Sequence, residues 1–194
     1  MPDLTHTDEP HEYRLDGVVI PSVTQVLSEV GLVDVSGPWF TDEVRARGTN
    51  VHLITELHDG GELHEEQVPL ELMGYLNAWK RFKADAGFVC ELVEHHVYHA
   101  VYHYAGTLDR VGTCDDGNGP QMLLDIKCGA HMPAHRLQTA AYAECIEWRT
   151  PPERCGVHLA ADGTYTVHRH DNPNDRRVWL AALAVANWKF NKGR

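Results

Sequence analysis

One short segment places the strongest constraint on how this chain can fold. Residues Gln121–Lys127, QMLLDIK, have the length and apolarity of a strand but carry two charges near their end. Asp125 and Lys127 are two residues apart, so on a strand their side chains leave the same face. Leu123 and Leu124 predict a buried central strand, where an unpaired carboxylate or ammonium is costly. The fold must therefore contain a sheet whose centre brings charged groups together.

The pattern on either side of Gly87 predicts the rest of the architecture. Helical spacing dominates before it, whereas strands and helices alternate after it. We expect a hairpin over 13–20 with its turn at Asp16-Gly17, a short helix between Ser22 and Gly31, helices over 41–57, 70–86, 134–148 and 172–191, and strands over 88–98, 104–113, 121–127, 155–160 and 164–169. This order predicts a mixed α/β fold with helices on a central sheet. Without a linker or repeat, residues 1–194 are expected to form one domain, with the hairpin and helices in 1–86 and the sheet core and last helix in 87–194.

The overall charge limits the possible partners. Seventeen Lys and Arg residues against 28 Asp and Glu residues give a net charge of −11, which argues against coating nucleic acid or a membrane by bulk charge. A local basic groove around an acidic, metal-loaded site remains compatible with this balance. No apolar run reaches the roughly 20 residues of a membrane helix. The acidic, polar N-terminal stretch does not resemble a secretory signal, so we expect a cytoplasmic protein.

Cysteine and histidine spacing excludes the common sequence-local metal sites. The five cysteines, at 90, 114, 128, 145 and 155, form no CxxC pair, so we expect free thiols rather than disulfides or a structural zinc site. His95 and His99 would share a strand face, but no cysteine or third histidine follows at zinc-site spacing. We therefore interpret nine of the histidines outside the motifs below as surface or structural residues: His95, His96, His99, His103, His131, His135, His158, His168 and His170.

Asp109 adds a second carboxylate to the Asp125–Lys127 pair. It lies near the middle of the neighbouring predicted strand, and a hairpin of suitable register would place it beside Asp125. Two converging carboxylates repel each other and attract a cation, and hard oxygen ligands favour Mg²⁺. A lysine beside such a cation suits phosphodiester hydrolysis. The alternative from these residues alone is an edge-strand ion pair, with Asp109 as an ordinary turn acid.

Four motifs in order give the chain a family resemblance. They are Gly48-Thr49-Asn50-Val51-His52 on a predicted helix, Gly106-Thr107-Leu108-Asp109 on a strand, Asp125-Ile126-Lys127 on the next strand, and Gln138-Thr139-Ala140-Ala141-Tyr142 on the following helix. Together they resemble the PD-(D/E)XK nuclease superfamily, specifically its RecB-like branch with the bacteriophage exonucleases. The resemblance implies a restriction-endonuclease-like core, with a central mixed β-sheet flanked by helices.

The resemblance also implies roles for the motif residues. Asp109 and Asp125 would be metal ligands, together with His52 and the backbone carbonyl of Ile126, and Lys127 would be the catalytic lysine. Gln138 and Tyr142, one helical turn apart, would lie beside the centre and steady a substrate phosphate or Lys127. The accessory candidates are Glu56, which could orient His52, and Glu94, preferred to Glu91 as an additional acid. The candidate DNA contacts are Arg45, Arg47 and Arg136.

The function implied is a Mg²⁺-dependent DNA exonuclease of phage recombination, replication or repair. Mn²⁺ is expected to substitute for Mg²⁺, and the cysteine spacing argues against the iron–sulfur cluster found in some RecB-like relatives. The implied partner is DNA, with a single-strand annealing or single-strand binding protein as a second partner; a phage-encoded chain would act in the host cytoplasm. Nothing in the sequence indicates an oligomeric state.

Two alternatives stay open: a structure- or sequence-specific endonuclease on the same fold, and a non-cleaving DNA- or partner-binding module.

Overall fold

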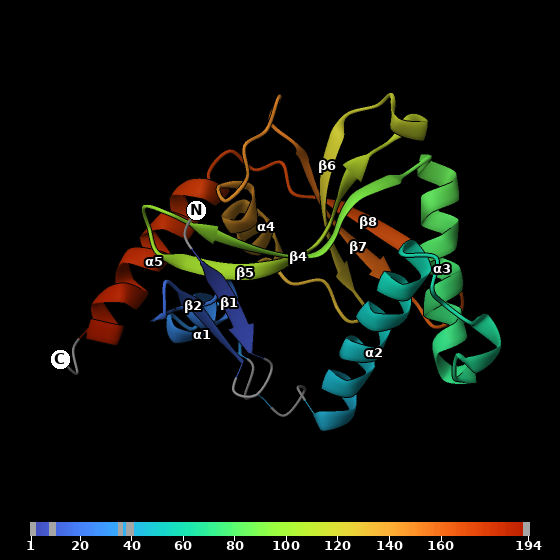
Figure 1. Ribbon diagram of the computed structural model, residues 1–194, viewed down its shortest axis with the longest axis horizontal. Helices are drawn as coiled ribbons and strands as arrows, with labels where there is room; N and C mark the ends of the chain where they lie inside the picture. The colour runs from blue at the N-terminus through green and yellow to red at the C-terminus, as the bar shows by residue number, and fades with distance from the viewer. Residues whose placement is uncertain (1–2, 8–10, 35–36, 38–40, 192–194) are drawn as a thin grey trace.

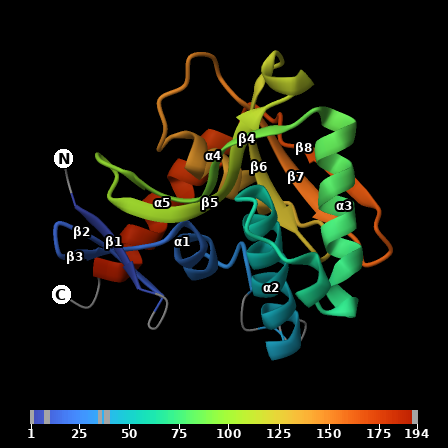
Figure 2. The same cartoon turned by 45° about the vertical axis from the view of Figure 1, so that its right-hand side comes forward.

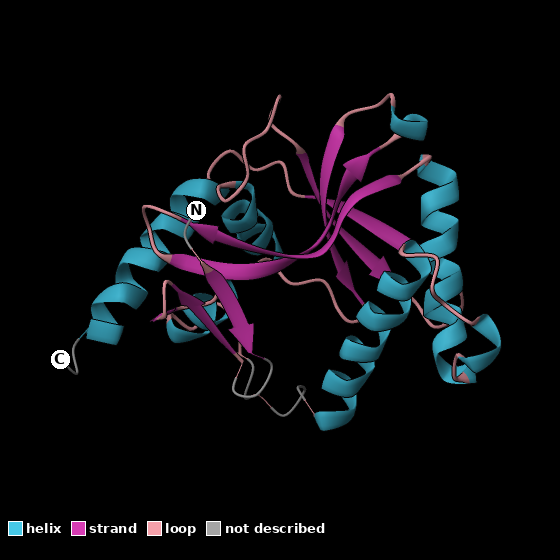
Figure 3. Cartoon of the chain, in the orientation of Figure 1, coloured by secondary structure: helices cyan, strands magenta, loops and turns pink. Residues whose placement is uncertain are grey.

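The protein contains two sheets and five α-helices in the part of the chain that its computed structural model describes, residues 3–7, 11–34, 37 and 41–191. The smaller sheet has the strand order β1-β2-β3 and the larger one the order β4-β5-β6-β7-β8 (Figures 1 and 3). The strands are β1 (Leu4–Thr7), β2 (Glu12–Leu15), β3 (Val18–Ile20), β4 (Val89–His99), β5 (Tyr104–Thr113), β6 (Gln121–Lys127), β7 (Glu153–Leu159) and β8 (Tyr165–Arg169). The helices are α1 (Val23–Glu29), α2 (Asp42–Asp59), α3 (Leu70–Ala86), α4 (His135–Ala143) and α5 (Asp175–Asn191).

The larger sheet is mixed and covered on both faces. β4, β5 and β6 pair antiparallel, β6 and β7 pair parallel across the α4 connection, and β8 returns antiparallel to β7. Helices α2 and α3 lie on one side, whereas α1, α4 and α5 lie on the other (Figure 2). This confirms the mixed α/β class, and the arrangement is consistent with a restriction-endonuclease-like core.

β6 is the buried central strand that its sequence predicts. Leu124 and Ile126 pack into the apolar cluster under α2 and α3, whereas Leu123 packs into the cluster under α4 and α5. Because side chains alternate along a strand, Asp125 and Lys127 leave β6 on the same side as Leu123, toward α4. The two charged residues thus face a helix that is tied to the sheet by apolar packing.

Most expected elements are present, with two corrections. The β2–β3 turn has φ +49° at Asp16 and +79° at Gly17, and Ser22 caps α1 through a capping box, both as expected. The helix expected over 134–148 ends at Ala143, because the Trp148 indole N–H occupies the Ala143 carbonyl at 2.8 Å. β1 was not expected, because LTHT has no apolar alternation and is held as a strand by pairing with β2. No helix in the described part of the chain combines the length and apolarity needed to cross a bilayer.

Candidate metal centre

Three acidic residues form a row across three neighbouring strands. The β4–β5 pairs Val93–Arg110 and His95–Leu108 place Glu94 opposite Asp109. The β5–β6 register ends at Arg110–Leu124, so the next residues on these strands are Asp109 and Asp125. The row therefore passes through β4, β5 and β6 where backbone pairing of β5 with β6 stops. The expected hairpin register, with Asp109 beside Asp125, is confirmed.

Side chains replace the backbone pairing at this point. The Asp109 carboxylate accepts the Ile126 N–H at 2.6 Å, and Asp125 accepts a charged hydrogen bond from Lys127 Nζ, also at 2.6 Å. Asp109 is 6% exposed and Asp125 only 1%. The second carboxylate oxygen of Asp125 is buried and has no hydrogen-bond partner among the described residues. A buried carboxylate oxygen without a partner is costly unless another ligand satisfies it.

His52 reaches the row from the middle of α2. Its Nδ1 lies 3.0 Å from Glu94 Oε1 and 3.9 Å from Asp109 Oδ1, while its Nε2 lies 3.2 Å from the Ile126 carbonyl oxygen. The structure thus brings His52 to the backbone carbonyl expected to act beside it. Glu94 itself has φ +42°, a left-handed conformation that non-glycine residues rarely adopt and that concentrates at functional sites.

The charges of the row perturb one another strongly. Burial raises the pKa of Asp125 to about 6, an effect that Lys127 opposes and Asp109 reinforces. Burial works against the charged form of His52, but Asp109 and Glu94 outweigh it and raise its pKa to about 9. Burial also disfavours the ammonium of Lys127, yet Asp125 and Asp109 raise its pKa. The row therefore concentrates negative charge, and His52 and Lys127 keep their protons beside it.

A buried arginine, Arg110, connects Glu94 of this row to α2 and α3, which cover the opposite face of the sheet from α4. Arg110, fully buried, donates to Asp59 at 2.7 Å, to Glu94 at 2.8 Å and to Thr55 at 3.0 Å. Asp59 also accepts from Lys83 at 2.6 Å and from the Trp79 indole at 3.1 Å. These bonds join α2, α3, β4 and β5, so they hold the helix that carries His52 against the strands that carry the acids.

Arg110 and Asp59 were not among the residues expected at the site. The available signal was Arg110 itself, a charge between Leu108 and Val111 on a strand predicted to be buried. Such a charge requires a buried partner. The sequence does not show that Asp59, fifty-one positions earlier at the end of a helix, is that partner.

Gln138 and Tyr142 share one face of α4, as expected for residues four apart. Gln138 donates to the Tyr142 hydroxyl at 3.2 Å. Tyr142 is 4% exposed, and burial together with the charges of Asp109 and Asp125 raises the pKa of its hydroxyl well above its ordinary value. The hydroxyl therefore stays protonated beside the acids and can donate a hydrogen bond.

The close contact of the Tyr142 ring with the backbone explains why the second motif has a glycine, Gly106. A Cβ at Gly106 would lie 2.6 Å from Tyr142 Cε1 and 3.2 Å from its hydroxyl oxygen.

We expect Gly106→Ala to displace the ring and to destabilise the protein by about 1–3 kcal/mol, as overpacking of a buried site does. Chemical denaturation measures this loss. The matched control is Gly48→Ala in α2. Apart from the nearby backbone of its own helix, no atom of the described residues lies within 4 Å of the added Cβ, so this substitution in a helix interior should stabilise the protein by up to about 1 kcal/mol. Equal effects of the two substitutions would contradict the contact between Gly106 and Tyr142.

The remaining candidates lie farther from the row or are engaged elsewhere. Glu56 is exposed, and among the described contacts Glu94, not Glu56, holds the His52 ring. Arg45 is exposed near the start of α2, and the Nε of Arg47 is buried without a hydrogen-bond partner in the described residues. Arg136 donates to Asp175, a fully buried carboxylate, so its guanidinium is held at the α4–α5 contact.

The donor set fits a hard divalent cation. Ligand atoms of His52, Glu94 and Asp109 all lie within 4.8 Å of one another. His52 Nε2 lies 3.2 Å from the Ile126 oxygen, to which it donates a hydrogen bond. Adjacent ligands of an octahedral ion with bonds near 2.1 Å are roughly 3.0 Å apart, so both atoms could bind one ion once His52 has lost a proton. The unpartnered oxygen of Asp125 supplies a further donor. These residues could therefore hold a divalent metal ion.

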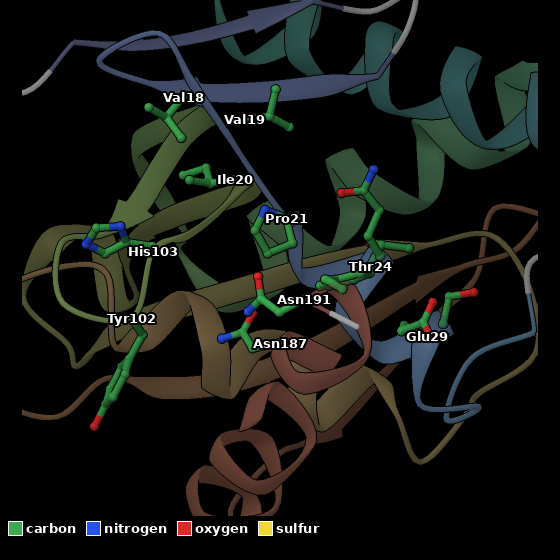
Figure 4. A pocket seen from close by; sticks show the side chains of 13 residues that line it. Val18, Val19, Ile20, Pro21, Thr24, Glu29, Tyr102, His103, Asn187 and Asn191 are labelled. Carbon is green, nitrogen blue, oxygen red and sulfur yellow. The ribbon is translucent and has the colours of Figure 1, made fainter. Parts of the chain in front are cut away.

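A separate pocket opens away from the acidic row. It has a volume of about 890 Å³ and lies between β3, α1, the β4–β5 turn and the end of α5 (Figure 4). Its lining includes Val18, Pro21, Tyr102 and Asn187. None of the residues of the acidic row lines it.

Comparison with known proteins gives structural similarities only. No family model and no curated protein matches the sequence. The fold is similar to that in the crystal structure of LHK-Exo in complex with dAMP, with a TM-score of 0.40, 14% identity, and coverage of 90% of this chain and 93% of that one. It is also similar to the crystal structure of SSO0001, with a TM-score of 0.39, 14% identity, and coverage of 88% and 85%. Both TM-scores are low, so the chemistry of the site is inferred from this chain's own residues.

Proposed function

We propose that this protein is a divalent-metal-dependent deoxyribonuclease, acting as an exonuclease. The observation that supports this most is the row of Glu94, Asp109 and Asp125 across three strands, with His52 at one end and Lys127 at the other. These carboxylates converge at one point of the sheet. One buried oxygen of Asp125 is left there without a hydrogen-bond partner in the described part of the chain.

The proposed metal ligands are Asp109, Asp125, His52 and the Ile126 carbonyl, with Glu94 as an additional acid. A bound Mg²⁺ or Mn²⁺ would supply Lewis-acid polarisation of the scissile phosphate and a water of lowered pKa. Glu94 holds Nδ1 of His52, which leaves Nε2 directed toward the Ile126 carbonyl. A carboxylate on the far nitrogen of a ligating histidine fixes both its tautomer and its orientation.

Lys127 is proposed to act on the phosphate. Its ammonium is held 2.6 Å from Asp125, and its side chain is 22% exposed, so it can turn from the carboxylate toward a bound strand. There it would neutralise charge that develops on the phosphorus oxygens and orient the attacking water. The protonated hydroxyl of Tyr142, held by Gln138, would donate to a neighbouring phosphate oxygen or steady Lys127. Arg45 and Arg47 on α2 are proposed to contact the backbone of the bound strand, and Arg136 would do so only after leaving Asp175.

Digestion of end-labelled linear and closed circular DNA, with Mg²⁺ or with EDTA, tests this proposal. We expect Mg²⁺-dependent loss of the linear substrate from its ends and no loss of the circle. Cleavage of the circle would instead establish an endonuclease on the same fold. Binding of DNA without cleavage of either substrate, in Mg²⁺ and in Mn²⁺, would establish a non-cleaving module.

Replacing Lys127 should stop turnover but preserve DNA binding. We expect Lys127→Ala to lower the cleavage rate by about 10²-fold or more, in the range measured for catalytic proton-transfer groups, with DNA affinity nearly unchanged. Lys127→Arg should recover little, because a planar guanidinium differs in shape and hydrogen-bond geometry from an ammonium. Single-turnover cleavage and a filter-binding assay measure the two effects.

The control for this pair is Lys189→Ala, an exposed lysine on α5 that contacts Glu29. Its cleavage rate should equal that of the wild type. Full activity in Lys127→Arg would reduce the role of Lys127 to simple charge neutralisation.

A further inference from the structure

The structure gathers five histidines from three separate segments beside β6 and α4. The rings of His131 and His168 stack at 4.2 Å, and His158 contacts His131 at 5.5 Å, His135 at 5.5 Å and His168 at 4.7 Å, all measured between ring centroids. His170 is the fifth, 6.4 Å from His131. The sequence led us to interpret these residues as surface or structural histidines. The structure adds that they are adjacent in the fold.

Three of these rings have the geometry of a ligand set. A ring nitrogen of each of His131, His135 and His158 lies within 4.8 Å of the other two. His135 and His158 are buried, whereas His131 is exposed, so one side of the group opens to solvent. Nitrogens bound to one tetrahedral ion at about 2.0–2.1 Å would be about 3.4 Å apart, so small side-chain rotations close the set.

His158 is already fixed in a metal-binding orientation. Its Nδ1 lies 2.9 Å from the Gly129 carbonyl, which can only accept, so this nitrogen carries the proton. The lone pair is then on Nε2, which is buried and has no hydrogen-bond partner among the described residues. The residue is 9% exposed. A histidine whose other nitrogen donates to a backbone carbonyl is the usual form of a metal ligand.

The second ligand, His135, is held more weakly than His158. His135 Nδ1 accepts the Met132 N–H at 3.4 Å, a distance at the long end for a hydrogen bond, so this contact is easily exchanged for another.

We propose that His131, His135 and His158 bind a transition-metal ion, which we infer to be Zn²⁺, at a site separate from the acidic row. Three imidazoles and a water are a donor set suited to Zn²⁺ and unsuited to Mg²⁺, which takes oxygen ligands. His131 and His135 come from the β6–α4 connection and the first turn of α4, and His158 comes from β7. His158 pairs with Lys127 in the β6–β7 register. The ion would therefore tie the connection that follows Lys127 to the neighbouring strand, whether or not the protein is a nuclease.

Co²⁺ titration of the metal-free, full-length protein tests this site. Four-coordinate Co²⁺ absorbs visible light far more strongly than Co²⁺ in an octahedral, oxygen-rich site, so the spectrum separates the histidine site from the acidic row. We expect a strong band that saturates at one equivalent, disappears on addition of Zn²⁺ and survives excess Mg²⁺. Zn²⁺ should also raise the Tm of the wild type, because a ligand that binds the folded state stabilises it.

Matched histidine variants locate the ion. His131→Ala replaces an exposed side chain, so its circular dichroism spectrum should match that of the wild type. It should weaken Zn²⁺ binding more than about tenfold and abolish the Tm increase. His64→Ala, an exposed histidine outside the cluster, and His52→Ala should both keep the band. The proposal is overturned if the wild type shows neither the band nor the Tm increase, or if the band survives His131→Ala and is lost in His52→Ala.

Discussion

Replacing Asp125 by alanine is expected to abolish DNA cleavage while the protein keeps its fold. The substitution removes a proposed metal ligand and the partner of Lys127, so the rate should fall by about 10³-fold or more, equivalent to several kcal/mol of lost transition-state stabilisation. Single-turnover cleavage in saturating Mg²⁺ measures the loss. Glu71→Ala, an exposed acid in the first turn of α3, is the matched control and should cleave normally.

Without metal, replacing Asp125 should not lower the free energy of unfolding, although it abolishes cleavage. The pKa of Asp125 is raised to about 6, so between its ordinary value of 3.8 and about 6 the folded state binds more protons than the unfolded chain. Stability from this group is therefore lost as pH rises through that interval, and the loss is complete above about pH 6. Asp125→Asn should remove this dependence and be at least as stable as the wild type at pH 7.

Near wild-type cleavage by Asp125→Ala would show that the acidic row is not the active site.

Replacing Arg110 by alanine is expected to cause the largest loss of stability among single substitutions near the site. It removes charged hydrogen bonds to Asp59 and Glu94 and leaves the buried side chain of Asp59 with Lys83 as its remaining cationic partner among the described residues. Breaking a buried ion pair by removing one partner costs about 3–5 kcal/mol. Denaturation in urea, with EDTA present, measures the change in the free energy of unfolding.

A double-mutant cycle separates this effect from simple loss of packing. If Arg110 acts mainly by compensating Asp59, Arg110→Met combined with Asp59→Asn should cost less than the sum of the single substitutions. The control is Arg81→Ala, whose exposed pair with Asp85 should be worth at most about 1 kcal/mol. Additive costs in the cycle would show that the two residues act independently.

The hydrogen bonds of Arg110 also couple the stability of the protein to metal binding at the acidic row. Arg110 holds Glu94, and Glu94 holds His52, so the helix α2 and the strand β4 are connected through one carboxylate. Glu94 keeps a left-handed backbone at φ +42° that this network must maintain. Loss of Arg110 should therefore also raise the metal concentration needed for cleavage.

The positions of several site residues could be predicted because they depend on residues close in the sequence. The same-face placement of Asp125 and Lys127 follows from the two-residue period of a strand, and that of Gln138 and Tyr142 from the helical turn. The register of a short hairpin then brings Asp109 beside Asp125. Arg110 and Asp59, by contrast, meet only through the packing of α2 against the sheet.

The amino-acid sequence by itself determined the mixed α/β class, most of the elements and the position of Asp109 beside Asp125, because periodicity and short-range register are local properties of a chain. Glu94 and His52 were candidates only through the family resemblance. Only the tertiary structure decided which buried charges compensate one another and which histidines meet. His131, His135 and His158 come from a connection, a helix start and a strand that are adjacent only in the folded sheet. Contacts between distant segments depend on how helices and strands pack around a shared core, and no spacing in the sequence encodes that arrangement.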